Sequence, residues 1–191
     1  MAVLEGRMRN VKYFFTTMII LCLFFSGCDK EPRQTHKSEK EPENPVIKEL
    51  NEEDKQRLAN QRALIEGYLP DNEEFREKYQ TAPGKLIFLK GLLERNVFKP
   101  EQEYEFECMG VILGDAFVQH LGMSWVIVED EYGRDPAVRL DEPSGHVSDM
   151  VVFPLTMILK RVERGEEADV FALFNGVATK MEQAQTRGNN P

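Results

Sequence analysis

The sequence has few cysteines and histidines and none of the familiar catalytic motifs. Its 191 residues include three cysteines and three histidines, and the histidines have no helical spacing that would let two of them bind one metal ion. It lacks a nucleophile elbow, a zinc-protease motif, a phosphate-binding loop and a Cys-x-x-Cys pair. These absences exclude the common hydrolase, nucleotide-binding and thiol-redox patterns, and we expect neither a metal nor a cofactor.

Basic residues are also scarce. The chain has 24 Lys and Arg against 33 Asp and Glu, a net charge of −9, whereas a nucleic-acid-binding protein presents a basic surface to the phosphate backbone. We therefore expect no nucleic-acid partner. With 41% hydrophobic and 30% charged residues, the composition is otherwise that of an ordinary globular domain.

No apolar run is long enough to span a membrane. The longest, residues 13–25, reads YFFTTMIILCLFF, whereas a transmembrane helix needs about 20 residues. A run of this length after several basic residues is typical of the hydrophobic core of a signal peptide. Translation from Met8 instead of Met1 would remove Glu5, an unusual residue in a basic leader, and both starts remain open.

The residues that end this run resemble the lipobox of bacterial lipoproteins. Phe25-Ser26-Gly27-Cys28 places an apolar residue and two small residues before a cysteine, with Phe25 where the consensus prefers leucine. The resemblance implies that residues 1–27 are removed, that Cys28 is diacylated, and that this lipid holds the chain at a membrane of the cell envelope. An ordinary signal peptide or a short anchor that ends at a cysteine is the alternative.

The residue after the cysteine indicates which membrane of the envelope holds the chain. In enteric-type bacteria an aspartate at that position resembles an inner-membrane retention signal, so Asp29 favours the inner membrane of a Gram-negative cell.

The mature residues 28–191 carry 21 basic and 32 acidic residues, a net charge of −11. Anionic headgroups repel such a surface, so the lipid must supply the membrane affinity.

Residues 28–49 predict a disordered tether. Eleven of the 21 residues from Asp29 to Glu49 are charged, three are proline, and only Val46 and Ile47 could enter a core. Such a segment cannot bury enough apolar surface to offset its chain entropy. We place a single globular domain at residues 50–181 and a flexible polar tail at 182–191.

Within the domain the hydrophobic period changes from helical to alternating and back. The pattern predicts an α+β fold with N-terminal helices, a short three-stranded antiparallel meander and two C-terminal helices. Asn51 and Asp169 are expected to cap helices, Gly110 and Gly114 to permit close packing, Cys108 to be a buried thiol, and Trp125 to lie in the core. The expected helices are 52–69, 83–98, 104–121, 154–164 and 170–181, and the expected strands are 123–128, 137–140 and 149–153.

Three stretches of this domain carry a family resemblance. Leu113-Gly114, residues 125–136 (WVIVEDEYGRDP) and residues 153–165 (FPLTMILKRVERG) resemble a bacterial domain-of-unknown-function family, number 3806, over roughly residues 75–175. The resemblance implies no reaction, cofactor or catalytic residue.

One dense polar cluster follows the central strand. Strand ends often display ligand groups, and several carboxylates could bind a hard cation, although the spacing does not match a calcium loop. We interpret the cluster, together with two basic residues of a later helix, as one structural salt-bridge network, and a binding site is the alternative. The candidate interaction residues are Glu129, Asp130, Glu131, Tyr132, Arg134, Lys160 and Arg161, with Arg139 as a further compensating charge.

Two classes of function remain open. The favoured hypothesis is a membrane-tethered, non-enzymatic binding domain with a protein partner; an immunity-type inhibitor that covers the basic active site of a toxin is one form of it. The alternative is an envelope enzyme that uses carboxylates of residues 129–135 for acid–base chemistry. An enzyme requires these carboxylates to converge in a hollow, whereas a binding domain allows them to point apart.

Overall fold

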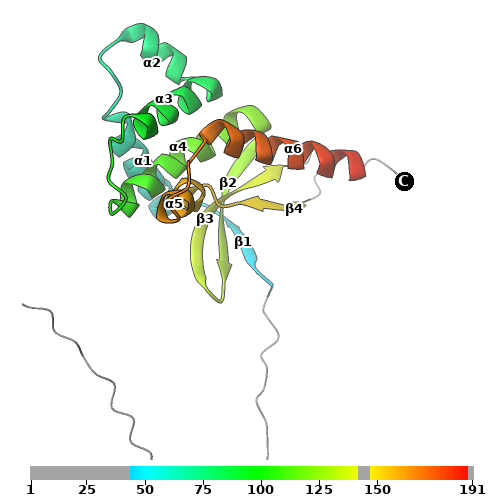
Figure 1. The fold of residues 1–191 in the computed structure, drawn as a ribbon. Coiled ribbons are helices and arrows are strands. Elements are labelled where there is room, and N and C mark those ends of the chain that lie inside the picture. Colours follow the sequence, from blue (N-terminus) through cyan, green and yellow to red (C-terminus); the bar gives the residue numbers. More distant parts are fainter. Residues whose placement is uncertain (1–43, 142–146, 189–191) are drawn as a thin grey trace, which may run out of the picture. The chain divides into compact units, whose positions relative to one another are not determined.

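The computed structural model describes residues 44–141 and 147–188 and has an α+β fold (Figure 1). The predicted signal peptide, Cys28, Asp29 and most of the predicted tether lie outside the described residues. Within the described part of the chain, no helix is both long enough and apolar enough to cross a membrane. In chain order the elements are β1 (Val46–Glu49), α1 (Glu52–Glu66), α2 (Glu73–Tyr79), α3 (Ala82–Glu94), α4 (Glu103–Leu121), β2 (Met123–Asp130), β3 (Gly133–Asp141), β4 (Val147–Val152), α5 (Leu155–Glu163) and α6 (Val170–Gly188).

The described residues form a four-stranded antiparallel sheet in the order β1-β2-β3-β4. The predicted three-stranded meander is therefore incomplete, because β1 lies in the segment predicted as tether. Its four residues pair with the end of β2 from Val46 opposite Glu129 to Glu49 opposite Val126. Backbone hydrogen bonds hold such an edge strand, so it needs little apolar surface of its own; Ile47 alone is half-buried.

Local signals predicted most helix ends correctly. Asn51 and Asp54 form a capping box at the start of α1, and the Asp169 carboxylate accepts hydrogen bonds from the backbone N–H groups of Phe171 and Ala172. Gly122, with φ of +67°, ends α4 in the left-handed conformation, which glycine adopts without steric cost. These caps set where α1, α4 and α6 begin or end.

Two helical segments were not predicted. Helix α2 has seven residues, too few for a periodic pattern to be distinguished from a loop. Helix α6 continues to Gly188, so the prediction that the helix ends at Met181 and is followed by a flexible tail is wrong for residues 182–188. Once the apolar residues up to Met181 have anchored a helix, each further residue adds a hydrogen bond at little entropic cost.

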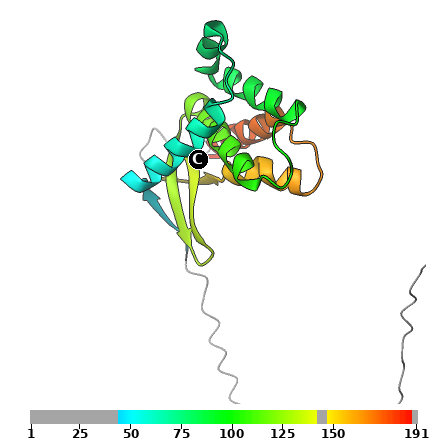
Figure 2. The same ribbon diagram turned by 90° about the vertical axis from the view of Figure 1, so that its left-hand side faces the viewer.

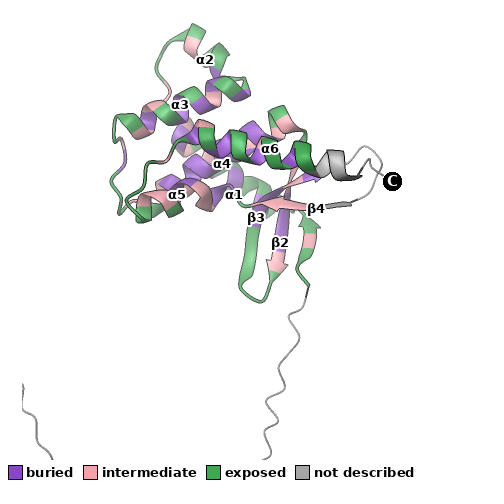
Figure 3. Ribbon diagram, turned by 45° about the vertical axis from the view of Figure 1, so that its right-hand side comes forward, coloured by how far each residue is buried: buried purple, intermediate pink, exposed green. Residues whose placement is uncertain are grey.

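Helix α4 is the centre of the fold (Figures 1 and 2). It contacts α1, α3, α5 and α6 as well as β2 and β3, and its middle turns are almost entirely buried (Figure 3). The prediction that Gly110 and Gly114 permit close packing is confirmed. A Cβ at Gly110 would lie 2.4 Å from the Cα of Leu155, and one at Gly114 would lie 2.3 Å from the indole of Trp125.

Two further predictions about the core can be compared with the structure. Cys108 is fully buried, as expected, and burial raises the pKa of its thiol to about 11. Trp125 lies on an inner strand and packs against the core, but it is only partly buried. Its indole N–H donates to the Asp115 carboxylate, whose side chain is 15% exposed.

Candidate functional site

The predicted acidic cluster lies at the free end of the β2–β3 hairpin, beyond the helices (Figure 1). This end of the hairpin is largely exposed (Figure 3), and Tyr132 at its tip is 88% exposed. The Asp130 carboxylate accepts hydrogen bonds from the backbone N–H groups of Tyr132 (2.8 Å) and Gly133 (3.2 Å). Asp130 therefore closes the turn.

The charges of this turn are compensated by elements far away in sequence. Glu129 forms an ion pair with Lys48 of β1, and this contact lowers the pKa of Glu129. Arg134 donates two hydrogen bonds, of 2.5 and 2.6 Å, to the buried carboxylate of Asp54 at the start of α1. The hairpin end is thus held by β1 and α1.

The predicted link to α5 is wrong. Among the described residues, no hydrogen bond or ion pair joins Lys160 or Arg161 to residues 129–135. Lys160 is exposed, and the Arg161 guanidinium donates to the backbone oxygen of Met157 in its own helix (2.8 Å). The reason is the placement of α5, which packs along α4 while the hairpin end extends past the helices.

The carboxylates of the turn lie at a largely exposed hairpin end. Arg134 lines a polar depression that it shares with Asp54, Arg57 and Tyr104, and Asp54 already compensates its charge. Within the described ranges, no group of three His, Cys, Asp or Glu side chains could hold a metal ion. At this turn, Asp130 instead holds the backbone of the turn, and Glu129 pairs with Lys48.

The Asp54–Arg134 pair should appear in the pH dependence of stability. Hydrogen bonds from Arg134 hold the pKa of Asp54 below its ordinary value of 3.8, although burial opposes the shift. A lowered folded-state pKa stabilises the protein above the unfolded-state pKa, and this stability is lost as the pH falls through the folded-state pKa. Wild type should therefore be more stable than Asp54→Asn at pH 7, and the difference should shrink from about pH 4 downward.

Urea unfolding at a series of pH values measures this effect. Asp71→Asn is the matched control, because Asp71 is fully exposed and lies 3.8 Å from its partner Arg76, so its curve should parallel that of wild type. A difference between wild type and Asp54→Asn that stays constant down to pH 2 would exclude the assigned role of the ion pair.

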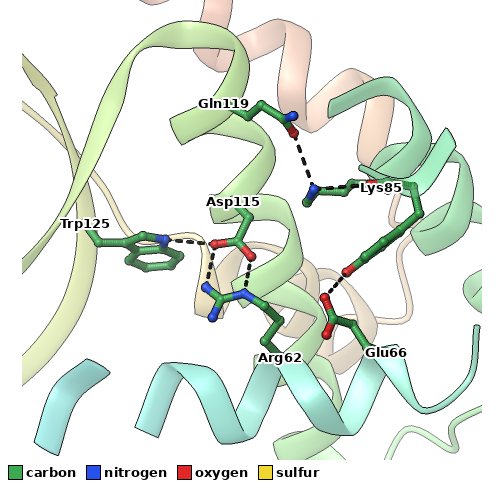
Figure 4. A network of polar contacts seen from close by, with 7 residues as sticks. Arg62, Glu66, Lys85, Asp115, Gln119 and Trp125 are labelled. Atoms are coloured by element: carbon green, nitrogen blue, oxygen red, sulfur yellow. Dashed lines mark hydrogen bonds and ion pairs between the residues drawn. The ribbon is translucent and has the colours of Figure 1, made fainter. Parts of the chain in front are cut away.

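A second polar network joins the helices to the sheet and was not predicted (Figure 4). The Asp115 carboxylate of α4 accepts hydrogen bonds from Arg62 of α1 at Nε (2.6 Å) and Nη2 (2.8 Å), and from the Trp125 indole of β2 (3.0 Å). Three elements thus meet at one carboxylate. Because this carboxylate joins α1, α4 and β2 through side chains that are only partly exposed, we assign the network a structural role.

The same network extends to α2 and α3. The buried Tyr79 hydroxyl donates to Glu66 (3.0 Å), and burial raises the pKa of Tyr79. Lys85 donates to the backbone oxygen of Tyr79 (3.2 Å) and to Gln119 (3.3 Å), while its ammonium lies 4.9 Å from the centre of the Tyr79 ring. Burial lowers the pKa of Lys85, and these contacts stabilise the packing of α3 on α4.

A hollow of about 460 Å³ lies between α3, the start of α4 and the loop from α5 to α6. Its floor is apolar and its rim is acidic; we call it the α3–α6 hollow. Four carboxylates line it against a single lysine, and that lysine, Lys90, lies 3.6 Å from Glu94. The apolar floor includes Leu92, Phe98, Phe106, Met109 and Val170, and the charged rim consists of Lys90, Glu94, Glu166, Glu167 and Asp169.

Two features make this hollow the candidate functional site. Its floor consists of core residues, so its shape is preformed, and its volume falls within the range of about 300–1,000 Å³ that is usual for binding sites.

Lys90 and Glu94 also border a second, more open hollow across α3, which exposes Tyr68 and Ile87. The site draws on separate segments of the chain, and its only signal in the sequence is the acidic run before Asp169.

Comparison with known proteins identifies a family resemblance and a fold. Residues 85–174 match the model of a family described as Domain of unknown function (DUF3806). The match supports the resemblance predicted from the sequence, and the description names no activity. The matched residues include Lys90, Glu94 and the acidic residues of the α5–α6 loop. No curated protein matches the chain.

A crystal structure from Bacteroides thetaiotaomicron VPI-5482, at 1.50 Å resolution, is similar in fold. It is 11% identical in sequence, with a TM-score of 0.56, and the alignment covers 74% of this chain and 50% of that chain. This chain therefore spans about half the length of its structural relative. At this level of identity the likeness concerns the fold alone.

Proposed function

We propose that the chain is a lipid-anchored protein of the bacterial cell envelope whose folded domain binds a protein partner and catalyses no reaction. The anchor is Cys28, supported by the lipobox-like residues 25–28 after a short apolar run. Because the mature chain carries a net charge of −11, the lipid supplies the membrane affinity. Asp29 favours the inner membrane in a Gram-negative cell.

One observation favours binding over catalysis. The carboxylates that could have served as acid and base lie at an exposed hairpin end, where Asp130 closes the turn and Glu129 pairs with Lys48. The α3–α6 hollow, by contrast, offers a preformed apolar floor; of its carboxylates, Asp169 caps α6, and Glu166 and Glu167 are exposed. An acidic domain of this kind suits a basic partner, which includes the toxin expected for an immunity-type inhibitor.

Replacing Cys28 tests the anchor. In cells fed with labelled palmitate, the wild-type chain should incorporate label, whereas Cys28→Ala should remain unlabelled and at precursor size because the signal peptide is not removed. Cys108→Ala is the matched control: the Cys108 thiol is buried in α4, so this variant should be labelled and processed normally. A Cys28→Ala chain that is cut and released normally would refute the lipoprotein proposal.

Site-specific crosslinking tests the binding role. A photoreactive amino acid at exposed positions on different faces, Tyr68, Tyr104, Tyr132 and Glu167, should yield a discrete heavier species from at least one position in intact cells. This design does not assume which face binds. If no position yields such a species, a binding role is contradicted.

A further inference from the structure

We infer that the α3–α6 hollow receives an apolar side chain from a polypeptide segment of the partner that carries Lys or Arg on both sides of it. This inference rests on the proposed binding function and assigns it a site and a recognition chemistry. The two parts of the hollow, its floor and its rim, determine the two parts of the ligand.

The floor requires an apolar group. Leu92, Phe106 and Met109 are at most 4% exposed and belong to the main core. They come from the rigid helices α3 and α4, so the hollow needs no rearrangement to be filled. Water finds few hydrogen-bond partners at such a floor, and a large apolar side chain inserted there removes its own apolar area from water.

The rim requires positive charge. Glu94 comes from α3, and Glu166, Glu167 and Asp169 come from the α5–α6 loop. The only lysine in the lining, Lys90, lies next to Glu94, so the carboxylates of the loop have no basic counterpart in the lining. Since Glu166 and Glu167 are both exposed, cations that flank the inserted side chain can reach them without being buried.

The charge of the whole domain favours the same ligand. A net charge of −11 in residues 28–191 accelerates the approach of basic segments and opposes acidic ones. A second copy of this chain would bring an equally acidic rim, and an anionic lipid surface would be repelled in the same way. These arguments point to a basic polypeptide from another protein.

Two fluorescein-labelled peptides test the chemistry of the ligand against the full lipidated chain in neutral micelles. The first has a Leu-Phe pair between two runs of three lysines, and the second has two serines in place of Leu-Phe. We expect saturable binding of the first by fluorescence anisotropy, binding at least about tenfold weaker for the second, and weakening with added salt. Equal binding of both peptides would overturn the inference.

Variants of the hollow test its location. Glu166→Gln with Glu167→Gln should weaken binding of the Leu-Phe peptide about tenfold, because two exposed ion pairs contribute up to about 1 kcal/mol each. Ala168→Phe, which fills the hollow without a change of charge, should weaken it at least as much. The matched control, Glu131→Gln with Asp135→Asn, removes the same charge from the hairpin end and should leave binding unchanged.

The outcomes distinguish failure of the site assignment from failure of the proposed binding function. If the hairpin control weakens binding as much as the rim variant, or if Ala168→Phe binds normally at an unchanged melting temperature, the hollow is not the site. If crosslinking in cells persists in both hollow variants, the assignment to the hollow fails while the binding function stands. If no crosslinked species forms from any position, the binding function itself fails.

Discussion

Replacement of Asp115 by alanine is expected to lower the free energy of unfolding by about 3 kcal/mol. The carboxylate accepts hydrogen bonds from Arg62 and Trp125, and the side chains of Asp115 and Arg62 are only 15% and 31% exposed. Without the Asp115 carboxylate, the Arg62 guanidinium and the Trp125 indole N–H stay partly buried and lose this acceptor. Leaving groups unpaired costs more than the intact pair contributes.

Urea unfolding followed by far-ultraviolet circular dichroism measures this loss. Glu74→Ala is the control: Glu74 forms a similar ion pair with Lys78, at 2.6 Å, but both side chains are largely exposed, so the change should stay within about 0.5 kcal/mol. Adding Arg62→Met to Asp115→Ala should restore part of the lost stability, because the unpaired charge is then gone. An Asp115→Ala protein as stable as wild type would contradict the structural role.

The parts of the fold that depend on neighbouring residues could be predicted from the sequence. The capping box at Asn51, the glycine that ends α4 and the change of period at Met123 are all local signals. Strand β1 could not be predicted in this way, because its stability comes from pairing with residues about 80 positions later. Helix α2 was missed because it is too short for its period to be recognised.

In the candidate sites, too, local patterns could be predicted and contacts between distant segments could not. The acidic residues at the end of β2 and in the turn after it were found because they are consecutive, but the partners of the turn, Lys48 and Asp54, lie far away in sequence. The prediction assigned the compensating charge to Arg134, Arg139, Lys160 and Arg161, and the fold keeps the last two apart from the turn. The α3–α6 hollow was missed because no pattern in one segment indicates which helices will meet around it.

Gly110 and Gly176 offer the sharpest test of the packing, because the same substitution should have opposite effects at the two positions. Both glycines lie inside helices, α4 and α6. Alanine in a helix interior is favoured over glycine by about 1 kcal/mol. At Gly176 nothing lies within 4 Å of an added Cβ, so Gly176→Ala should raise the free energy of unfolding by about 0.5–1 kcal/mol.

At Gly110 the added methyl group meets backbone. Its Cβ would lie 2.4 Å from the Cα of Leu155 and 2.6 Å from the backbone oxygen of Pro154, and these atoms cannot turn aside as the end of a flexible side chain could. Helix α5 would have to move away from α4, which opens the core around Ile158, a fully buried residue. Overpacking of this kind costs about 1–3 kcal/mol, occasionally more, and the better helix propensity of alanine offsets about 1 kcal/mol of it. Gly110→Ala should therefore lower the free energy of unfolding by up to about 2 kcal/mol.

Denaturant unfolding of the two variants beside wild type provides the measurement, with the slope of each transition as a check that the unfolding stays two-state. A stabilised Gly110→Ala protein would mean that α5 does not pack on α4 as closely as the structure has it. Because the loop after α5 forms the acidic rim of the α3–α6 hollow, displacement of α5 should also weaken binding of the Leu-Phe peptide. Gly176→Ala should bind it as wild type does.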